Sequence, residues 1–258
     1  MDTPTAAREF VRAKAVVEAD KIYESCLGHP AIAALAAFNR HLATRPLTRP
    51  ELRLFFASLA AFNRHTIGGI AILAGRLSDE LLPHVPKLGH EIGAYVLDAA
   101  VDEYGLRESV THVELGRNFA EHLGIPADEV EARENACASS TEIGDALFSW
   151  YREMPVAFAL GVHTASEITS TEEFGSWHDT FLKFPEYRLS KEAAEFEYLR
   201  VHFSHEPTHT SSALQCVGRY LEALPACARG LHEGARAYLS LYGRMFHELD
   251  TLIFAGGS

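Results

Sequence analysis

Residues 201–209, with the sequence VHFSHEPTH, place three histidines and one glutamate within a single short segment. On a helix that turns about 100° per residue, His202, Glu206 and His209 project onto one stripe roughly 60° wide. Apolar neighbours such as Leu199 predict that this helix is half-buried, and buried titratable groups are costly unless something binds them. Imidazole and carboxylate side chains together suit iron, manganese or zinc. The segment therefore predicts a helix that presents a metal site to other helices.

The remainder of the chain shows the spacing of helices rather than the strict alternation of strands. Thr48 is a good N-cap, Gly105 ends one helix, Ser109 begins the next, and Ser190 is the expected N-cap of the helix with the histidines. Pro155 falls inside one long expected helix, which must accommodate it, and a break between helices is expected near Pro225. Besides a short segment over 79–82, which Ser78 would cap, we expect helices over 6–27, 30–44, 50–73, 90–104, 109–122, 126–135, 139 or 141 to about 170, 190 onward, and two within 211–254.

The chain contains neither an internal repeat nor a long linker rich in proline, glycine or serine, so we expect a single helical domain over residues 1–258. The predicted fold class is all-α, with about eight to ten helices. Small residues line the segment 159–166, which would allow that helix to pack closely against a neighbour.

Composition excludes several classes of function. The 35 acidic and 23 basic residues give a net charge of −12, which disfavours binding to nucleic acid. The first 21 residues carry charges throughout and do not resemble a signal peptide, and no run approaches a membrane span. The four cysteines are scattered, which indicates reduced thiols and a cytoplasmic protein.

Two further segments offer ligands that could complete a metal site. In the segment 97–115, Glu103 lies at the end of one predicted helix and His112 lies in the first turn of the next, so the break at Gly105 lets both face a shared centre. In the segment 159–170, Glu167 ends an otherwise apolar stretch, and His163 lies one turn before it on the same face. Taken alone, Glu103 and His112 are better explained as ordinary polar residues at helix ends, and Glu167 is equally compatible with an ordinary surface carboxylate.

Taken in order, four motifs resemble the heme-oxygenase-like diiron oxidases and oxygenases, whose fold is shared with TenA-type thiaminases and the PQQ-forming oxidase. Residues 101–105 are similar to the family's N-x-x-D-E-x-G element, and residues 109–115 are similar to its S-H-x-x-L element. Residues 159–167 are similar to A-L-G-x-x-x-x-x-E. Residues 202–209 provide H-x-x-x-E-x-x-H, where the family usually has aspartate in place of the glutamate. The resemblance extends over about residues 50–225.

The resemblance implies a helical bundle with two irons that activate O2, and a small amino-acid-derived or carboxylic-acid substrate on a biosynthetic pathway. Expected reactions are N-oxygenation, desaturation or oxidative C–C cleavage, and a homodimer is expected as well. An arginine would suit a carboxylate substrate, with Arg64, Arg117, Arg152 and Arg200 as candidates. The implied iron ligands, three from the segment 198–210 and three from the two earlier segments, are Glu103, His112, Glu167, His202, Glu206 and His209.

Some details depart from the family pattern and leave alternatives open. Pro207 removes a backbone donor next to Glu206 and could re-aim that side chain. His205 is an additional imidazole beside the ligand set. Glu153 could replace Glu167 as the third carboxylate, although the separation of Glu167 from the histidines fits the family better.

Three other functions use the same residues differently. A metal-free enzyme of the TenA or PQQ-oxidase type would use them for acid–base chemistry or substrate binding, and a TenA-type nucleophile could be Cys137 with Glu142. A helical protein could bind iron without turnover. A zinc hydrolase is less compatible, because catalytic zinc usually takes three protein ligands and a water rather than six.

Overall fold

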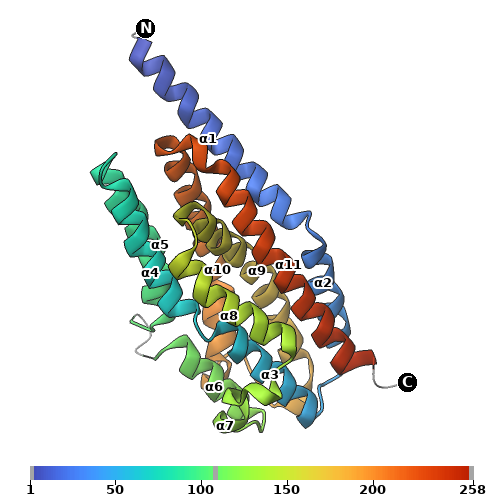
Figure 1. The fold of residues 1–258 in the computed structure, drawn as a ribbon. Coiled ribbons are helices and arrows are strands. Elements are labelled where there is room, and N and C mark those ends of the chain that lie inside the picture. The colour runs from blue at the N-terminus through green and yellow to red at the C-terminus, as the bar shows by residue number, and fades with distance from the viewer. Residues whose placement is uncertain (1–2, 107–109, 256–258) are drawn as a thin grey trace.

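The computed structural model describes residues 3–106 and 110–255, and within them every regular element is helical (Figure 1). This confirms the all-α prediction. The α-helices are α1 (Thr3–Leu27), α2 (Pro30–Leu42), α3 (Arg49–Asn63), α4 (Thr66–Leu81), α5 (Pro86–Glu103), α6 (His112–His122), α7 (Ala127–Glu131), α8 (Ala138–Glu153), α9 (Val156–Lys183), α10 (Glu197–Ala223) and α11 (Ala228–Phe254). Short 3-10 helices lie at Arg133–Asn135, Pro185–Tyr187, Ala194–Phe196 and Pro225–Cys227.

The helix expected over 50–73 is divided in the structure. Thr48 does cap its beginning, in a capping box in which Glu51 accepts a hydrogen bond from the Thr48 backbone N–H at 2.7 Å. The helix then breaks at Arg64 and His65, where no glycine or proline marks the sequence. Ser78 was wrongly predicted to cap a separate segment, because it lies inside α4, where its hydroxyl donates to the Gly89 carbonyl of α5.

The later helices differ from the expected ranges at their ends. The single helix expected over 139 to about 170 is divided in the structure, because Pro155, which lacks a backbone N–H, separates α8 from α9. The prediction that Ser190 caps the histidine-bearing helix was wrong, since α10 begins at Glu197 after a 3-10 turn. The helix then continues through Pro207 and past the expected boundary at 211, and ends before the predicted break at Pro225.

Helix α9 forms the centre of the bundle and packs against α10 and α11. Two glycines allow a close approach to α11: a Cβ added at Gly161 would lie 2.0 Å from the Leu231 carbonyl oxygen, and one added at Gly234 would lie 2.0 Å from that of Phe158. This confirms the close packing expected from the small residues of α9. It also fixes the helix that carries Glu167.

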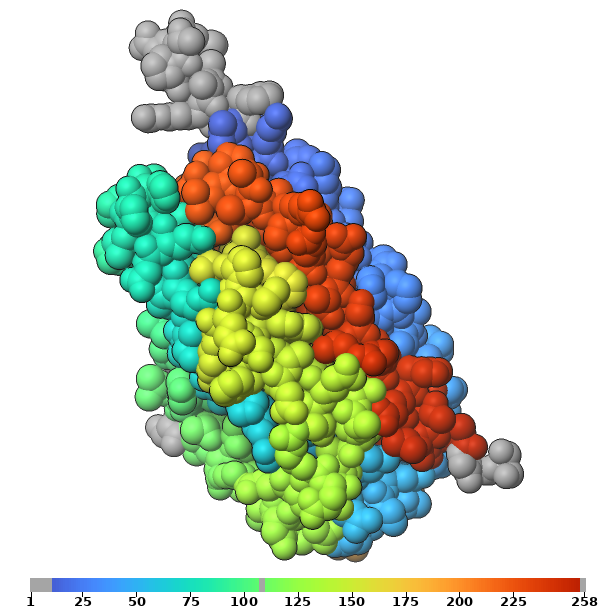
Figure 2. All heavy atoms as spheres, viewed as in Figure 1, coloured from blue at the N-terminus to red at the C-terminus, as the bar shows by residue number. Residues whose placement is uncertain are grey.

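The outer helices enclose this centre. Helix α8 contacts α3, α4 and α11, and Figure 2 shows it in yellow-green on the face between the teal α4–α5 pair and the red α11. Helices α4 and α5 pack side by side, and α10 contacts α5 as well as α9. The end of α5 and the middle of α10 therefore lie close to α9. None of the helices in the described part of the chain is long and apolar enough to cross a membrane.

Candidate metal centre

The turn after α5 positions the first two candidate ligands. Gly105 adopts a left-handed conformation with φ of +67°, and its N–H donates to the Asp102 carbonyl at 2.7 Å. Helix α6 then begins at His112, with Thr111 as its N-cap. The predicted start at Ser109 lies outside the described residues. As expected from the sequence, Glu103 ends one helix and His112 opens the next.

The first group of candidate ligands consists of Glu103, His112 and His202. The Glu103 Oε1 lies 3.2 Å from His112 Nδ1 and 3.6 Å from His202 Nε2. The His202 Nδ1–H donates to the Tyr198 carbonyl at 2.7 Å, because a carbonyl can only accept, and this leaves Nε2 facing Glu103. The His202 ring also stacks on Phe174, with the centroids 4.0 Å apart. The orientation of this imidazole is therefore fixed by its surroundings.

The second group consists of Glu167 on α9 with Glu206 and His209 on α10. His209 Nδ1 lies 3.7 Å from Glu167 Oε2. The Glu206 Oε2 is fully buried and has no hydrogen-bond partner among the described residues. The Thr210 hydroxyl donates to the Glu167 backbone carbonyl at 2.7 Å, which ties α10 to α9 beside the group. Glu206 remains directed into this group despite Pro207.

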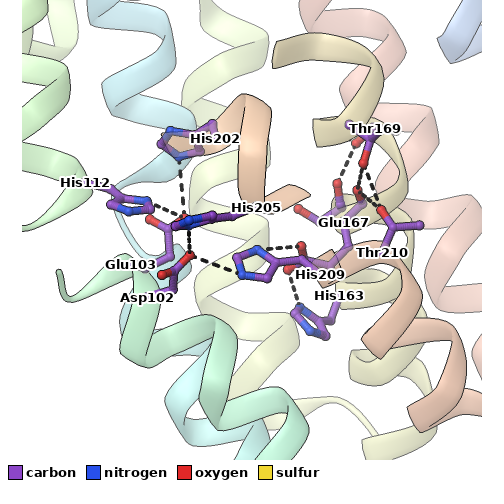
Figure 3. Close-up of polar contacts among 12 residues, drawn as sticks. Asp102, Glu103, His112, His163, Glu167, Thr169, His202, His205, His209 and Thr210 are labelled. Atoms are coloured by element: carbon purple, nitrogen blue, oxygen red, sulfur yellow. Dashed lines mark hydrogen bonds and ion pairs between the residues drawn. The ribbon is translucent and has the colours of Figure 1, made fainter. Parts of the chain in front are cut away.

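Within residues 3–106 and 110–255, these are the two groups of histidine, cysteine, aspartate or glutamate whose potential ligand atoms all lie within 4.8 Å of one another. Figure 3 shows the labelled residues of both groups near one another, with Asp102 in contact with His205 and His209. The structure thus brings together, in two sets of three, all six residues that the sequence singled out. Each set could hold one metal ion, and the donor atoms are those that iron accepts.

The electrostatics of the two groups differ. Burial alone would raise the pKa of Glu103, but the imidazoles of His112 and His202 outweigh it and hold this pKa well below its usual range. Burial, together with the charges of Glu103 and Asp102, raises the pKa of Glu167 to about 8. Burial and the charge of Glu167 also raise the pKa of Glu206 well above its usual value. The second group therefore has more carboxylate charge than its own residues can balance.

Asp102 is a functional candidate that the sequence did not identify. Its side chain is fully buried, and its Oδ2 lies 2.9 Å from His205 Nδ1 and 3.2 Å from His209 Nε2. A carboxylate in this position orients the imidazole of a metal-binding histidine. His205 therefore contacts Asp102 rather than joining either group of three. The available signal was the Asp102–Glu103 pair before a glycine, which equally resembles a solvated end of a helix.

His163 and Glu153 are the two remaining candidate ligands, and they occupy different positions relative to the metal groups. His163 is buried with Nδ1 3.4 Å from Glu167 Oε1, and burial, with a contribution from His209, lowers its pKa to about 3. It adjoins the second group without belonging to it. Glu153 is exposed at the end of α8 and belongs to neither group. The geometry favours Glu167 over Glu153 as the third carboxylate.

The two groups border a cavity of about 380 Å³. Its buried inner end is lined by five of the six candidate ligands, all except His209, and its apolar lining includes Phe56 and Leu59 of α3 and Ile70 of α4. The exposed residues Arg64 and Arg133 mark its outer end, and the half-buried Arg117 also lines it.

Only some of the four arginines that the sequence suggested as partners of a substrate carboxylate line this cavity. Arg64 and Arg117 line it. Arg152 instead lies over the Phe148 ring, and Arg200 pairs with Glu197. Arg117 is engaged by two glutamates, whereas the hydrogen bond found for Arg64 is to a backbone carbonyl. Arg64 is therefore the candidate with the most freedom to bind an anion.

A TenA-type nucleophile is not assembled in this structure. The Cys137 Sγ is buried 2.9 Å from the Ser140 hydroxyl and does not line the cavity. Glu142 pairs with Arg244 on α11 instead. The four cysteines are all free thiols.

A helical bundle that gathers carboxylates and histidines from several helices around a buried centre is the architecture of helical metalloproteins. A family model described as "iron-containing redox enzyme" matches residues 70–243, more than half of the chain, and the chain belongs to this family. The match supports an oxidoreductase that contains iron and confirms the resemblance to proteins with the heme-oxygenase-like fold. Among curated proteins, none matches the chain significantly in sequence.

Proposed function

We propose that this protein is a non-heme diiron enzyme that activates O2 to oxidise a small amino-acid-derived or carboxylic-acid substrate, by N-oxygenation, desaturation or oxidative C–C cleavage. The observation that carries the proposal is the pair of adjacent three-residue groups, each with carboxylate and imidazole donors, at the inner end of one cavity. Glu103, His112 and His202 would hold one iron. Glu167, Glu206 and His209 would hold the other.

The residues present fit two cations. Glu206 has a buried oxygen without a hydrogen-bond partner in the described chain, and the raised pKa values of Glu167 and Glu206 reflect carboxylates placed together without a counter-charge. Three carboxylates would neutralise most of the charge of two ferrous ions. When bound, the irons would supply the electrons that reduce O2 and thereby the oxidant for the substrate.

The protein's own residues prepare the site for that chemistry. The Tyr198 carbonyl holds the His202 ring so that the Nε2 lone pair of His202 faces inward. Asp102 accepts from the Nε2–H of His209, which leaves the Nδ1 lone pair of His209 facing Glu167. The apolar wall formed by residues such as Phe56 and Ile70 limits water next to the reacting groups. Arg64, which lines the exposed end of the cavity, would bind a substrate carboxylate.

The proposal is tested by adding ferrous iron without oxygen and then mixing with O2 in a stopped-flow spectrometer, using wild type and His202→Ala. We expect about two irons per chain and a transient visible band in the wild type, both diminished in the variant. A protein that binds two irons but does not consume O2 with candidate substrates present would be an iron-binding protein without turnover. A protein that binds little iron would contradict the proposal altogether.

A further inference from the structure

One wall of the cavity carries a polar stripe that the metal groups do not use. Ser166, Ser170 and Glu173 on α9 are spaced i, i+4 and i+7, so they share one face of the helix, and all three line the cavity. The cavity lining contributed by α3 is mostly apolar and includes Phe56 and Leu59. A cavity with one polar and one apolar wall suits a substrate whose chain carries a polar group at a defined position.

Glu173 is the charged member of this stripe. Its side chain is 3% exposed. The Tyr242 hydroxyl donates to Glu173 Oε2 at 2.6 Å and fixes the carboxyl group from behind. For Oε1, no hydrogen bond is found within the described residues, and the side chain lines the cavity. Glu173 therefore offers one oxygen to whatever occupies this space.

Among the described residues, no cationic side chain pairs with Glu173. It belongs to neither metal group, although its charge contributes to the raised pKa of Glu206. Of the cationic residues that line the cavity, Arg64 and Arg133 are exposed, and the half-buried Arg117 pairs with Glu114 and Glu131. Burial raises the pKa of Glu173 to about 8, although the Tyr242 hydroxyl opposes the shift. A cation bound beside Glu173 would offset the cost of burying its charge.

We propose that Glu173 binds a protonated amine of the substrate, so that this enzyme acts on a compound with an aliphatic chain and an ammonium group. The inference rests on the proposed function for the identity of the cavity as a substrate site. The ammonium group would donate to Glu173 Oε1, while the aliphatic chain lies against Phe56 and Leu59 and any carboxylate reaches Arg64. Glu173 then determines specificity, because it distinguishes an amine from a neutral group of the same size.

The test compares hexylamine with hexan-1-ol, which have the same chain length and differ in charge at neutral pH. Both are titrated calorimetrically into the manganese-loaded wild type and into Glu173→Gln. We expect the wild type to prefer the amine, and the variant to lose about tenfold or more of that preference, the scale of one hydrogen bond between charged groups. Affinity for the alcohol should stay nearly unchanged.

Two further variants separate recognition from packing. Glu173→Asp should recover part of the preference for the amine. Tyr242→Phe removes the hydrogen bond from Tyr242 to Glu173 but keeps the carboxylate, so it should retain the preference for the amine. If Tyr242→Phe and Glu173→Gln lose the preference equally, Glu173 acts through packing and the proposal is wrong. The same ratio of amine to alcohol affinity in wild type and Glu173→Gln would also overturn it.

Metal titration of the same samples tests the proposed function separately. The wild type and Glu173→Gln should bind the same number of Mn²⁺ ions, because Glu173 lies outside both groups. A wild type that binds no metal would contradict the diiron proposal. The ratio of amine to alcohol affinity would then be measured in the metal-free proteins. A lower ratio in Glu173→Gln than in the wild type would support the role of Glu173, and an equal ratio would contradict it.

Discussion

The two groups of candidate ligands have the same size but different charge balance. In the first, one carboxylate lies between two imidazoles, and the pKa of Glu103 is lowered. In the second, two carboxylates share one imidazole, and the pKa values of Glu167 and Glu206 are raised. The residues of the first group therefore balance one another, whereas the second group has an excess of carboxylate that a cation would offset. The metal-free protein should be strained mainly in the second group.

The largest expected effect is stabilisation by metal. A ligand at one hundred times its dissociation constant contributes about 2.7 kcal/mol, which corresponds to about 5–10 °C for a domain of this size. Ferrous iron added without oxygen should raise the midpoint of thermal unfolding by this order. The double variant His112→Ala/Glu206→Gln, which removes one ligand from each group, should show almost no rise. An equal rise in both proteins would place the metal elsewhere.

Next in size is a contrast between two matched substitutions in the metal-free protein. Glu206→Gln removes a carboxyl group whose ionisation is disfavoured and should raise the free energy of unfolding at pH 7 by about 1–3 kcal/mol. Glu103→Gln weakens contacts with two imidazoles and should lower it by about 1–3 kcal/mol. Urea unfolding measures both. If both substitutions changed the free energy of unfolding in the same direction, the two groups would not differ in charge balance as described.

Glu173 is a buried carboxylate outside both groups, and it shows separately how a raised pKa affects the stability of the metal-free protein. The pKa of Glu173 is raised from 4.5 to about 8, so the folded protein keeps a proton that the unfolded chain releases. Stability of the metal-free protein should therefore fall as pH rises through that window. Glu173→Gln should fall less steeply than the wild type between pH 5 and pH 8. Parallel curves for the two proteins would show that Glu173 does not titrate as described.

The smallest expected effect concerns the contact that supports the second group. Thr210→Val removes the hydrogen bond to the Glu167 carbonyl and should cost about 0.5–1.5 kcal/mol, with a modest loss of metal affinity. Thr251→Val is the control, because the exposed Thr251 hydroxyl donates to a carbonyl within its own helix, that of His247 in α11, and ties no second helix. Equal effects of the two substitutions on metal binding would contradict a supporting role for Thr210.

Much of the candidate site could be predicted because its residues follow helical spacing and the order of a known family. His202, Glu206 and His209 share one face of a helix, and Gly105 marks the break that lets Glu103 meet His112. The helical spacing and the break at Gly105 can be recognised within a short stretch of sequence, and the remaining information comes from the order of the motifs along the chain. They identified all six residues that the structure gathers into two groups.

Other features depend on tertiary contacts that no local pattern encodes. Glu172 is exposed and its neighbour Glu173 is buried, although the two are chemically identical in sequence. The buried position of Asp102 depends on the approach of His205 and His209 from α10. The break between α3 and α4 carries neither glycine nor proline, so the apolar spacing continues across it. Of the expected caps, Thr48 does begin a helix, whereas Ser78 lies inside α4 and Ser190 precedes the start of α10 by several residues.

The most direct test of the central claim is anomalous diffraction at the iron edge, from crystals grown without oxygen in the presence of ferrous iron. We expect two iron peaks per chain, one among Glu103, His112 and His202 and the other among Glu167, Glu206 and His209. A single peak, or peaks outside these two groups, would contradict a diiron centre built from the six residues.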